Sequence, residues 1–342
     1  MGLFTYLCLL ASLSPAAADS APPVADTAPL RIPYTRYTVN DALDREVTFY
    51  LSRVPAKEKN GRKPIALFIQ GSGCQSLFSQ SGEHIFGGLQ DLLLVAAQGR
   101  VRVLVVEKPG VKFLDAPPRP GSAEGSSEEF RTEHTLPRWA EANVAALRAC
   151  WTLPGIDPDR TLVVGHSEGG IVAARIAALV PQVTHVASLS GGGPSQLFDL
   201  VELQRQPRPN DKPGDAEQRV QGVYDEWARI QADPDSITQS WLGHPYRRWS
   251  SFLKHGVTDE LLRSQAKVYL AHGSLDAAVP VQAFDVVVAE LRARGRNLTF
   301  ERLEGADHGF HTAEMPPGSP EGLQSLFGRV LTWILADEGK GG

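Results

Sequence analysis

The stretch RTLVVGHSEGG, residues 160–170, decides the fold that we expect for this chain. Its first half is rich in apolar, β-branched residues, which favour a strand covered on both faces. Residues 170–180 follow with a helical pattern rich in alanine, and Pro181 ends it. Glycines 165, 169 and 170 allow a sharp turn between the two halves. The stretch therefore predicts a strand that leads directly into a helix.

Strands and helices alternate along most of the chain. Apolar runs predict further strands at residues 64–70, 101–107, 183–190, 267–271 and 298–303. Helical patterns occupy residues 85–98, 137–151, 281–294 and 323–336. Two earlier β-rich runs, 34–39 and 45–54, are expected to form an antiparallel hairpin at a sheet edge. The alternation predicts an α/β fold with a mostly parallel sheet of about eight strands, flanked by helices.

One segment, residues 195–265, is too long for an ordinary connection between a helix and a strand. We interpret it as a cap inserted over the carboxyl edge of the sheet, with residues 34–194 and 266–342 forming the core. Its aromatic side chains either line an apolar pocket or form the core of the cap itself. They include Tyr224, Trp227, Trp241, Tyr246, Trp249 and Phe252.

The N-terminal residues predict export. An apolar stretch at residues 3–13 precedes Ala16-Ala17-Ala18, which satisfies the small-residue rule for signal-peptidase cleavage. We expect a signal peptide at residues 1–18, cleaved after Ala18, and a periplasmic or secreted protein. A membrane anchor is the alternative, but the stretch is shorter than the ~20 residues of a spanning helix. Residues 19–33, rich in proline and alanine, are expected to be a mobile leader.

Composition limits the classes of partner. The formal charge of −5 supplies no basic field that would attract nucleic acid or an anionic membrane, so a small molecule is the expected partner. Without the signal peptide, Cys74 and Cys150 remain, and an oxidising compartment would permit a disulfide. The predicted topology argues against one, because it places the two residues at opposite edges of the sheet.

Within the opening stretch, Gly165, Ser167 and Gly169 form a G-x-S-x-G pattern. The pattern places a serine on a strained turn between strand and helix, where its hydroxyl projects and side chains at the flanking positions would clash. The predicted strand before it and helix after it are the context that this motif requires. Ser167 is therefore the candidate nucleophile.

A serine hydroxyl is a poor nucleophile at neutral pH, so it needs a base and a carboxylate that orients the base. Asp276, in HGSLDAAVP, follows the strand predicted at 267–271, and His308, in GADHGF, follows the strand at 298–303. The carboxyl edge of an open α/β sheet is where such sites lie. We therefore expect Ser167, Asp276 and His308 to meet there.

Some of these residues also fit other roles. Asp276 also fits a helix N-cap before Pro280. His272 and His311 are further candidates for the base, but neither follows a terminal strand within a glycine-flanked loop. The side chain of Asp307 is expected to point away from its neighbour His308. The histidine pair 308 and 311 lacks a third ligand at metal-binding spacing, so we expect no metal and no cofactor.

The tetrahedral intermediate of acyl transfer needs two hydrogen-bond donors. One is expected from the backbone of Glu168 and the other from the loop after residues 64–70, with Ser72 preferred over Gly73. The alternative is that the Gly-Ser-Gly sequence of this loop only makes a tight turn. A dinucleotide site fits less well, because the third glycine is absent and no helix begins there.

Together GHSEGG, HGSLDAAVP, GADHGF and the QGSG loop resemble the α/β-hydrolase superfamily, in particular its dienelactone hydrolase and prolyl oligopeptidase-like branch. The resemblance covers residues 64–193 and 266–336. It implies the α/β-hydrolase fold and hydrolysis of carboxylic esters, thioesters or amides through an acyl-enzyme. Gln70 stands where a histidine is commoner in that branch.

We expect a carboxylesterase in which Ser167 attacks the acyl carbonyl, His308 transfers the proton and Asp276 supports the imidazolium. A peptidase acting on short peptides is the alternative, and a noncatalytic binder on a hydrolase scaffold is a further one. The adjacent Arg247 and Arg248 either bind a substrate carboxylate or form a solvated surface pair.

Overall fold

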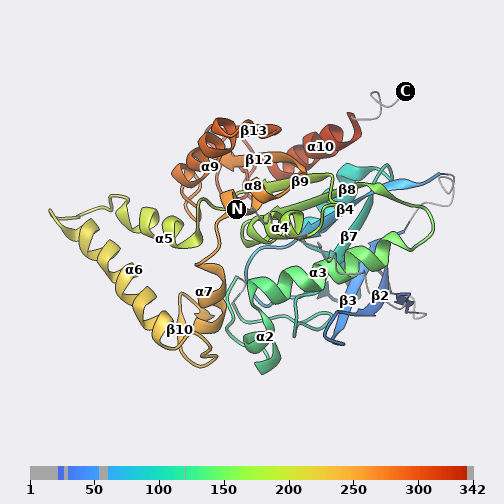
Figure 1. The fold of residues 1–342 in the computed structure, drawn as a ribbon, viewed down its shortest axis with the longest axis horizontal. Helices are drawn as coiled ribbons and strands as arrows, with labels where there is room; N and C mark the ends of the chain where they lie inside the picture. Colours follow the sequence, from blue (N-terminus) through green and yellow to red (C-terminus); the bar gives the residue numbers. More distant parts are fainter. Residues whose placement is uncertain (1–21, 27–29, 54–60, 120, 337–342) are drawn as a thin grey trace, which may run out of the picture.

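One large sheet runs through the centre of the structure, a computed structural model that describes residues 22–26, 30–53, 61–119 and 121–336 (Figure 1). Its strands are β1 (Val24–Ala25), β2 (Tyr34–Asn40), β3 (Glu46–Ser52), β4 (Lys63–Ile69), β7 (Arg102–Val106), β8 (Ile156–His166), β9 (His185–Leu189), β12 (Lys267–Gly273) and β13 (Leu298–Leu303). Within the described residues their order is β1-β2-β3-β7-β4-β8-β9-β12-β13. Pairings from β1 to β7 are antiparallel, and those from β7 to β13 are parallel. The predicted α/β fold with a mostly parallel sheet is confirmed.

Helices cover both faces of the sheet. One layer contains α3 (Leu136–Trp151), α4 (Glu168–Leu179), α8 (Val257–Arg263) and α9 (Val281–Ala293), and the other contains α1 (Leu89–Ala97) and α10 (Glu321–Leu335). In β4, Ile65 and Leu67 pack into the first layer and Ala66 and Phe68 into the second. Successive strand side chains point to opposite faces, so a continuous apolar run fits a strand covered by helices on both sides. Burial of each large aliphatic or aromatic side chain contributes about 1.5–3 kcal/mol.

The helix expected at residues 85–98 begins later than predicted. A hairpin of β5 (Phe78–Ser81) and β6 (His84–Gly87) precedes it, and α1 starts at Leu89. Gly82, at φ +58°, makes the tight turn between the two strands. Gly87 then donates its backbone N–H to Asp91 in the first turn of α1. The prediction was wrong for residues 85–88 because Ile85 and Phe86 lie in a short strand, in which adjacent side chains point to opposite sides: Ile85 packs against the core and Phe86 is exposed.

The leader that was predicted to be mobile, residues 19–33, contains residues that join the sheet and the core. Val24 and Ala25 form β1, which pairs with β2 and adds a ninth strand to the expected eight. Ile32 is buried in the second core layer, and Arg53 donates hydrogen bonds to the carbonyl oxygens of Leu30 and Ile32. The backbone groups of the β2 edge are available for pairing, so this part of the leader joins the sheet. The signal peptide expected at residues 1–18 lies outside the described residues.

The segment after β9 contains α5 (Gln196–Arg205), α6 (Asp215–Ala232), β10 (Ser240–Trp241), β11 (His244–Pro245) and α7 (Tyr246–Phe252). These elements gather at one end of the sheet, with α6 at the left edge of Figure 1. Four aromatic side chains of this segment pack together with Ile230 and Leu253: Tyr246, Trp249, Trp227 and Trp241. These four therefore form mainly the core of the cap itself. Helix α8, the last part of the predicted insertion, instead packs on α4 in the main core.

Two further expectations concern the described residues. Cys74 and Cys150 are buried free thiols, as the predicted topology indicated. No helix in the described part of the chain combines the length and apolar character needed to cross a membrane.

Candidate active site

The turn between β8 and α4 holds Ser167 in a strained conformation, with φ 57° and ψ −127°. A Cβ atom added to Gly165 would lie 1.9 Å from the carbonyl oxygen of Gly169, and one added to Gly169 would lie 2.1 Å from that of Ile69. Only glycine fits at either position. The Ser167 N–H donates to the carbonyl oxygen of Leu189 at 2.9 Å, which fixes the turn against β9. The local geometry is that of a nucleophile elbow.

Asp276 lies in the loop between β12 and α9 and is 5% exposed. Its Oδ1 accepts hydrogen bonds from the N–H groups of Ala278 and Val279, each at 2.9 Å, and its Oδ2 lies 2.8 Å from Nδ1 of His308. The residue therefore orders the turn before α9 with one oxygen and contacts the imidazole with the other. Burial opposes ionisation, but the hydrogen bond and charge of His308 outweigh it and lower the pKa of Asp276.

His308 follows β13 and its side chain is partly exposed. The backbone oxygen of His308 lies 2.8 Å from Nε2 of His166, the residue before the nucleophile. With an ionised Asp276, the imidazole carries its proton on Nδ1 and leaves Nε2 free to accept one. This contact brings the loop after β13 directly against the elbow, so the three sequence-predicted residues meet at the carboxyl edge of the sheet.

The other two candidate bases, His272 and His311, each contact a backbone carbonyl oxygen. His272 is buried with Nε2 3.0 Å from the carbonyl oxygen of Val279 and 3.4 Å from Oδ2 of Asp276, so it supports the acid loop. Nε2 of His311 lies 2.8 Å from the carbonyl oxygen of Pro316. The Asp307 carboxylate accepts from the N–H groups at 309 and 311, and thus points away from the imidazole as expected.

Two cavities adjoin the nucleophile, and both are lined by Ser167 and Ser72. The His308-side cavity, of about 370 Å³, is also lined by Gln70, Gly71, Phe86, Leu89, His166 and His308. The cap-side cavity, of about 220 Å³, is also lined by Ile171, Asp199, Leu200, Leu242, Arg248 and Trp249. Among the described residues no hydrogen bond joins the Ser167 hydroxyl to His308. The two side chains instead share the wall of one cavity.

The loop after β4 lies against the nucleophile. A Cβ atom added to Gly71 would be 3.3 Å from the Cβ of Ser167. Gly73 has φ +100°, and an added Cβ there would lie 2.7 Å from the backbone nitrogen of Gly121, so the loop is also the tight turn that the alternative interpretation required. Glu168 begins α4, where the first backbone N–H groups have no partner within the helix. Ser72 and Glu168, the two residues preferred as donors, line the cap-side cavity together with Ser167.

A buried charge cluster, made of Lys108, His134, Glu168 and Arg248, adjoins this loop and was not predicted. Oε2 of Glu168 accepts from Nε and Nη2 of Arg248 at 3.1 and 2.5 Å, and its Oε1 lies 3.1 Å from Nε2 of His134. Burial disfavours the ionised form, but Arg248 and then His134 outweigh it and hold the pKa of Glu168 well below its usual value. The cap is therefore tied to the residue that follows the nucleophile.

The two adjacent arginines differ in their surroundings. Arg248 is 2% exposed, with its guanidinium 4.0 Å from the ring centroid of Trp249 and 4.4 Å from that of Phe252. The surface interpretation was wrong for this residue, because the cap folds it over the elbow. Arg247 is partly exposed and donates to the Thr132 carbonyl and to Asp235. No pattern in the sequence links positions 168 and 248, so their pairing could not be predicted.

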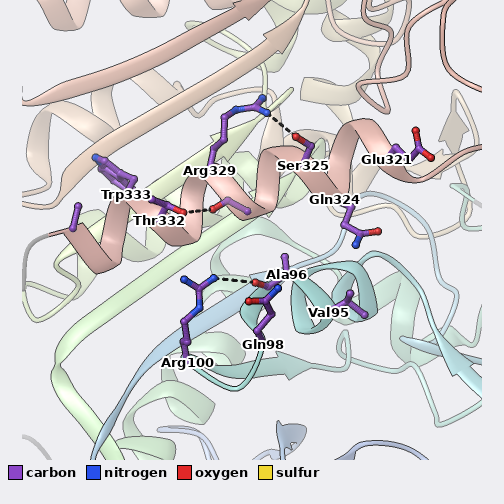
Figure 2. Close-up of a pocket in the computed structure, with 12 residues that line it drawn as sticks. Val95, Ala96, Gln98, Arg100, Glu321, Gln324, Ser325, Arg329, Thr332 and Trp333 are labelled. Atoms are coloured by element: carbon purple, nitrogen blue, oxygen red, sulfur yellow. Dashed lines mark hydrogen bonds between the residues drawn. The ribbon is translucent and has the colours of Figure 1, made fainter.

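A groove with a volume of about 830 Å³, larger than either cavity beside Ser167, lies elsewhere, between α1 and α10. Figure 2 shows Arg329 hydrogen-bonded to the Ser325 side chain on α10, and Arg100 hydrogen-bonded to the backbone oxygen of Ala96 on α1. None of the three candidate catalytic residues lines this groove. The candidate site is therefore not in the larger groove.

The fold and the elbow define an α/β hydrolase, and the sequence comparison agrees. Residues 67–318 match the model of the alpha/beta hydrolase family, so the chain belongs to that family. A search of curated proteins finds no match.

Solved structures with the same fold include esterases and prolyl oligopeptidase-like peptidases. Est1E from Butyrivibrio proteoclasticus is 16% identical with a TM-score of 0.55, over 89% of this chain and 100% of that one. Dipeptidyl peptidase 4 from Porphyromonas gingivalis is 14% identical with a TM-score of 0.58, over 89% of this chain but 35% of its own. A puromycin-hydrolysing peptidase from Mycobacterium tuberculosis is 16% identical with a TM-score of 0.59, over 97% of this chain and 42% of that one. This chain thus spans less than half the length of these two peptidases, and the likeness is one of fold.

Proposed function

We propose that the protein is a serine hydrolase that cleaves carboxylic esters. The observation that carries the proposal is the 2.8 Å contact between Asp276 and His308 beside a cavity that Ser167 also lines. In the first step Ser167 attacks the acyl carbonyl as its proton passes to Nε2 of His308. The imidazolium then gives this proton to the leaving oxygen, and water releases the acid from the acyl-enzyme by the same route.

The positions of the two cavities support a placement of the two parts of the substrate. Because His308 must protonate the leaving oxygen, the alcohol part belongs in the His308-side cavity. The acyl part then occupies the cap-side cavity, which is the smaller of the two at about 220 Å³. A short acyl chain fits this arrangement better than a long one.

A peptidase remains the second candidate function, because several solved structures of the same fold are peptidases. Acylation by an amide requires the same nucleophile and base, so the site geometry alone does not distinguish the two. The difference lies in the leaving group, which is an alcohol in one case and an amine in the other.

The test combines active-site labelling with a substrate series. A fluorophosphonate probe is expected to label wild-type protein at Ser167 and to leave the S167A variant unlabelled, with S325A as a control in the remote groove of Figure 2. Hydrolysis of p-nitrophenyl acetate and butyrate is expected to exceed that of the octanoate. Loss of Ser167 should lower kcat by about 10⁴-fold or more. Cleavage of aminoacyl-anilides with no activity on esters would replace the esterase by the peptidase.

A further inference from the structure

Lys108, two residues beyond the end of β7, is 1% exposed. Its ammonium donates hydrogen bonds to the backbone oxygens of Gly71 and, at 2.7 Å, Gly73. An ammonium is costly to bury unless its environment compensates the charge, and no salt bridge within 4.0 Å compensates this one among the described residues. Its direct partners are therefore the two carbonyl groups of the loop beside the nucleophile.

Because the peptide bond is planar, this contact also fixes the direction of the N–H group in the same peptide. In a trans peptide the carbonyl of one residue and the N–H of the next point in opposite directions. With the Gly71 carbonyl turned to the ammonium, the N–H of Ser72 is directed to the opposite side of the loop. Gly71 packs against Ser167, and Ser72 lines both cavities at the nucleophile. The buried cation and the reacting centre therefore contact the same peptide group.

We propose that Lys108 is a positioning residue of the oxyanion hole: its ammonium holds and polarises the Gly71–Ser72 peptide so that the Ser72 N–H can stabilise the oxyanion. This role rests on the proposed serine hydrolase function. A positive charge at the carbonyl draws electron density from the peptide and makes its N–H a stronger donor. The second donor, the N–H of Glu168, belongs to the residue whose carboxylate lies in the same buried charge cluster.

The surrounding charges keep Lys108 protonated at neutral pH. Burial is the largest influence and lowers the pKa of Lys108. Glu168 from α4 raises it, Arg248 from α7 lowers it, and Cys74 and Glu107, from the loops after β4 and β7, raise it. The net result is a pKa of about 8. The ammonium should therefore lose its proton as the pH rises through about 8. An oxyanion hole that depends on this charge should weaken over the same interval.

The K108M variant removes the charge and both hydrogen bonds while keeping a side chain of similar length. Loss of one oxyanion-hole donor lowers kcat by about 100- to 1000-fold, so loss of its orientation and polarisation is expected to lower kcat for p-nitrophenyl acetate by about 10- to 100-fold. KM should change by less than about twofold, because the donor acts mainly in the transition state. The matched control is K112M, which makes the same substitution at an exposed lysine.

A pH profile separates this role from a structural one. In wild-type protein kcat should fall above pH 8, and in K108M this alkaline decrease should be absent. A folded K108M variant with wild-type kcat would overturn the proposal. If K108M does not fold, the wild-type profile still decides, because a constant kcat between pH 7 and pH 10 in folded protein contradicts a role for the ammonium. Wild-type protein that neither hydrolyses esters nor accepts the fluorophosphonate probe would instead refute the proposed function itself.

Discussion

Two groups of polar side chains adjoin Ser167, and they are built differently. The candidate catalytic residues come from loops after β8, β12 and β13, and the His308 side chain is 28% exposed. The buried charge cluster draws Arg248 from the cap onto Glu168, and each of these side chains is 2% exposed or less. Within the first group the imidazole is partly exposed and the acid behind it is buried, whereas Arg248 and Glu168 of the second group are both buried. We propose that the first group carries out the proton transfer and that the second holds its surroundings in place.

Replacing a residue of the first set should lower the rate by several orders of magnitude, with a smaller loss of stability because Asp276 is also buried and hydrogen-bonded. The D276N variant keeps the size of the side chain but no longer stabilises an imidazolium or selects its tautomer. We expect kcat for ester hydrolysis to fall by about 10³- to 10⁴-fold. Steady-state kinetics together with thermal denaturation would measure both effects. A rate within tenfold of wild type would remove Asp276 from the catalytic residues.

Removing Arg248 from the second set should mainly lower stability. The R248M variant removes the guanidinium from the buried Glu168 carboxylate and leaves it only the contact with His134. Loss of one partner of a buried ion pair costs about 3–5 kcal/mol of stability. The neighbouring R247M variant loses only partly exposed contacts, which are worth about 1 kcal/mol or less. Urea denaturation of the two variants compares a buried and an exposed arginine at adjacent positions. Equal losses would show that the cluster does not stabilise the junction of cap and core.

Two buried carboxyl groups near the nucleophile, those of Glu168 and Asp199, have pKa shifts in opposite directions. Glu168 pairs with Arg248 and has a lowered pKa, whereas Asp199 forms no ion pair within the described residues. Burial, and to a smaller degree the charge of Asp276, raises the pKa of Asp199 to about 8, against the opposing hydrogen bond from the Gly193 N–H. The folded state therefore retains a proton on Asp199 at neutral pH.

The raised pKa of Asp199 has a measurable consequence for stability. As the pH rises from about 4, the usual pKa of an aspartic acid, to about 8, the unfolded chain loses this proton while the folded chain keeps it. Unfolding therefore becomes more favourable as the pH rises. The D199N variant removes this effect, and its stability relative to wild type should increase from pH 4 to pH 8. Thermal midpoints across this range would measure it, with D225N on the exposed side of α6 as control. A difference that does not depend on pH would contradict the shift.

The parts of the site that could be predicted are those with local causes. Gly165 and Gly169 are required by contacts within a few residues of Ser167 or with the adjacent strand, so the motif itself carries the information. The positions of Asp276 and His308 follow from the strands before them, because parallel strands deliver their following loops to one edge. The hairpin at β5 and β6 was missed because four-residue strands leave too short a pattern to separate from a helix start.

The amino-acid sequence by itself determined the alternation of strands and helices and the order of the elbow, acid and base, because these depend on hydrophobic periodicity and on turns between neighbouring residues. Only the tertiary structure decided that Arg248 lies buried on Glu168 and that Lys108 contacts the loop at Gly71. Such pairs join residues 37 and 80 positions apart. Their energy comes from desolvation and charge compensation within the folded interior, an environment that no local pattern in the chain encodes.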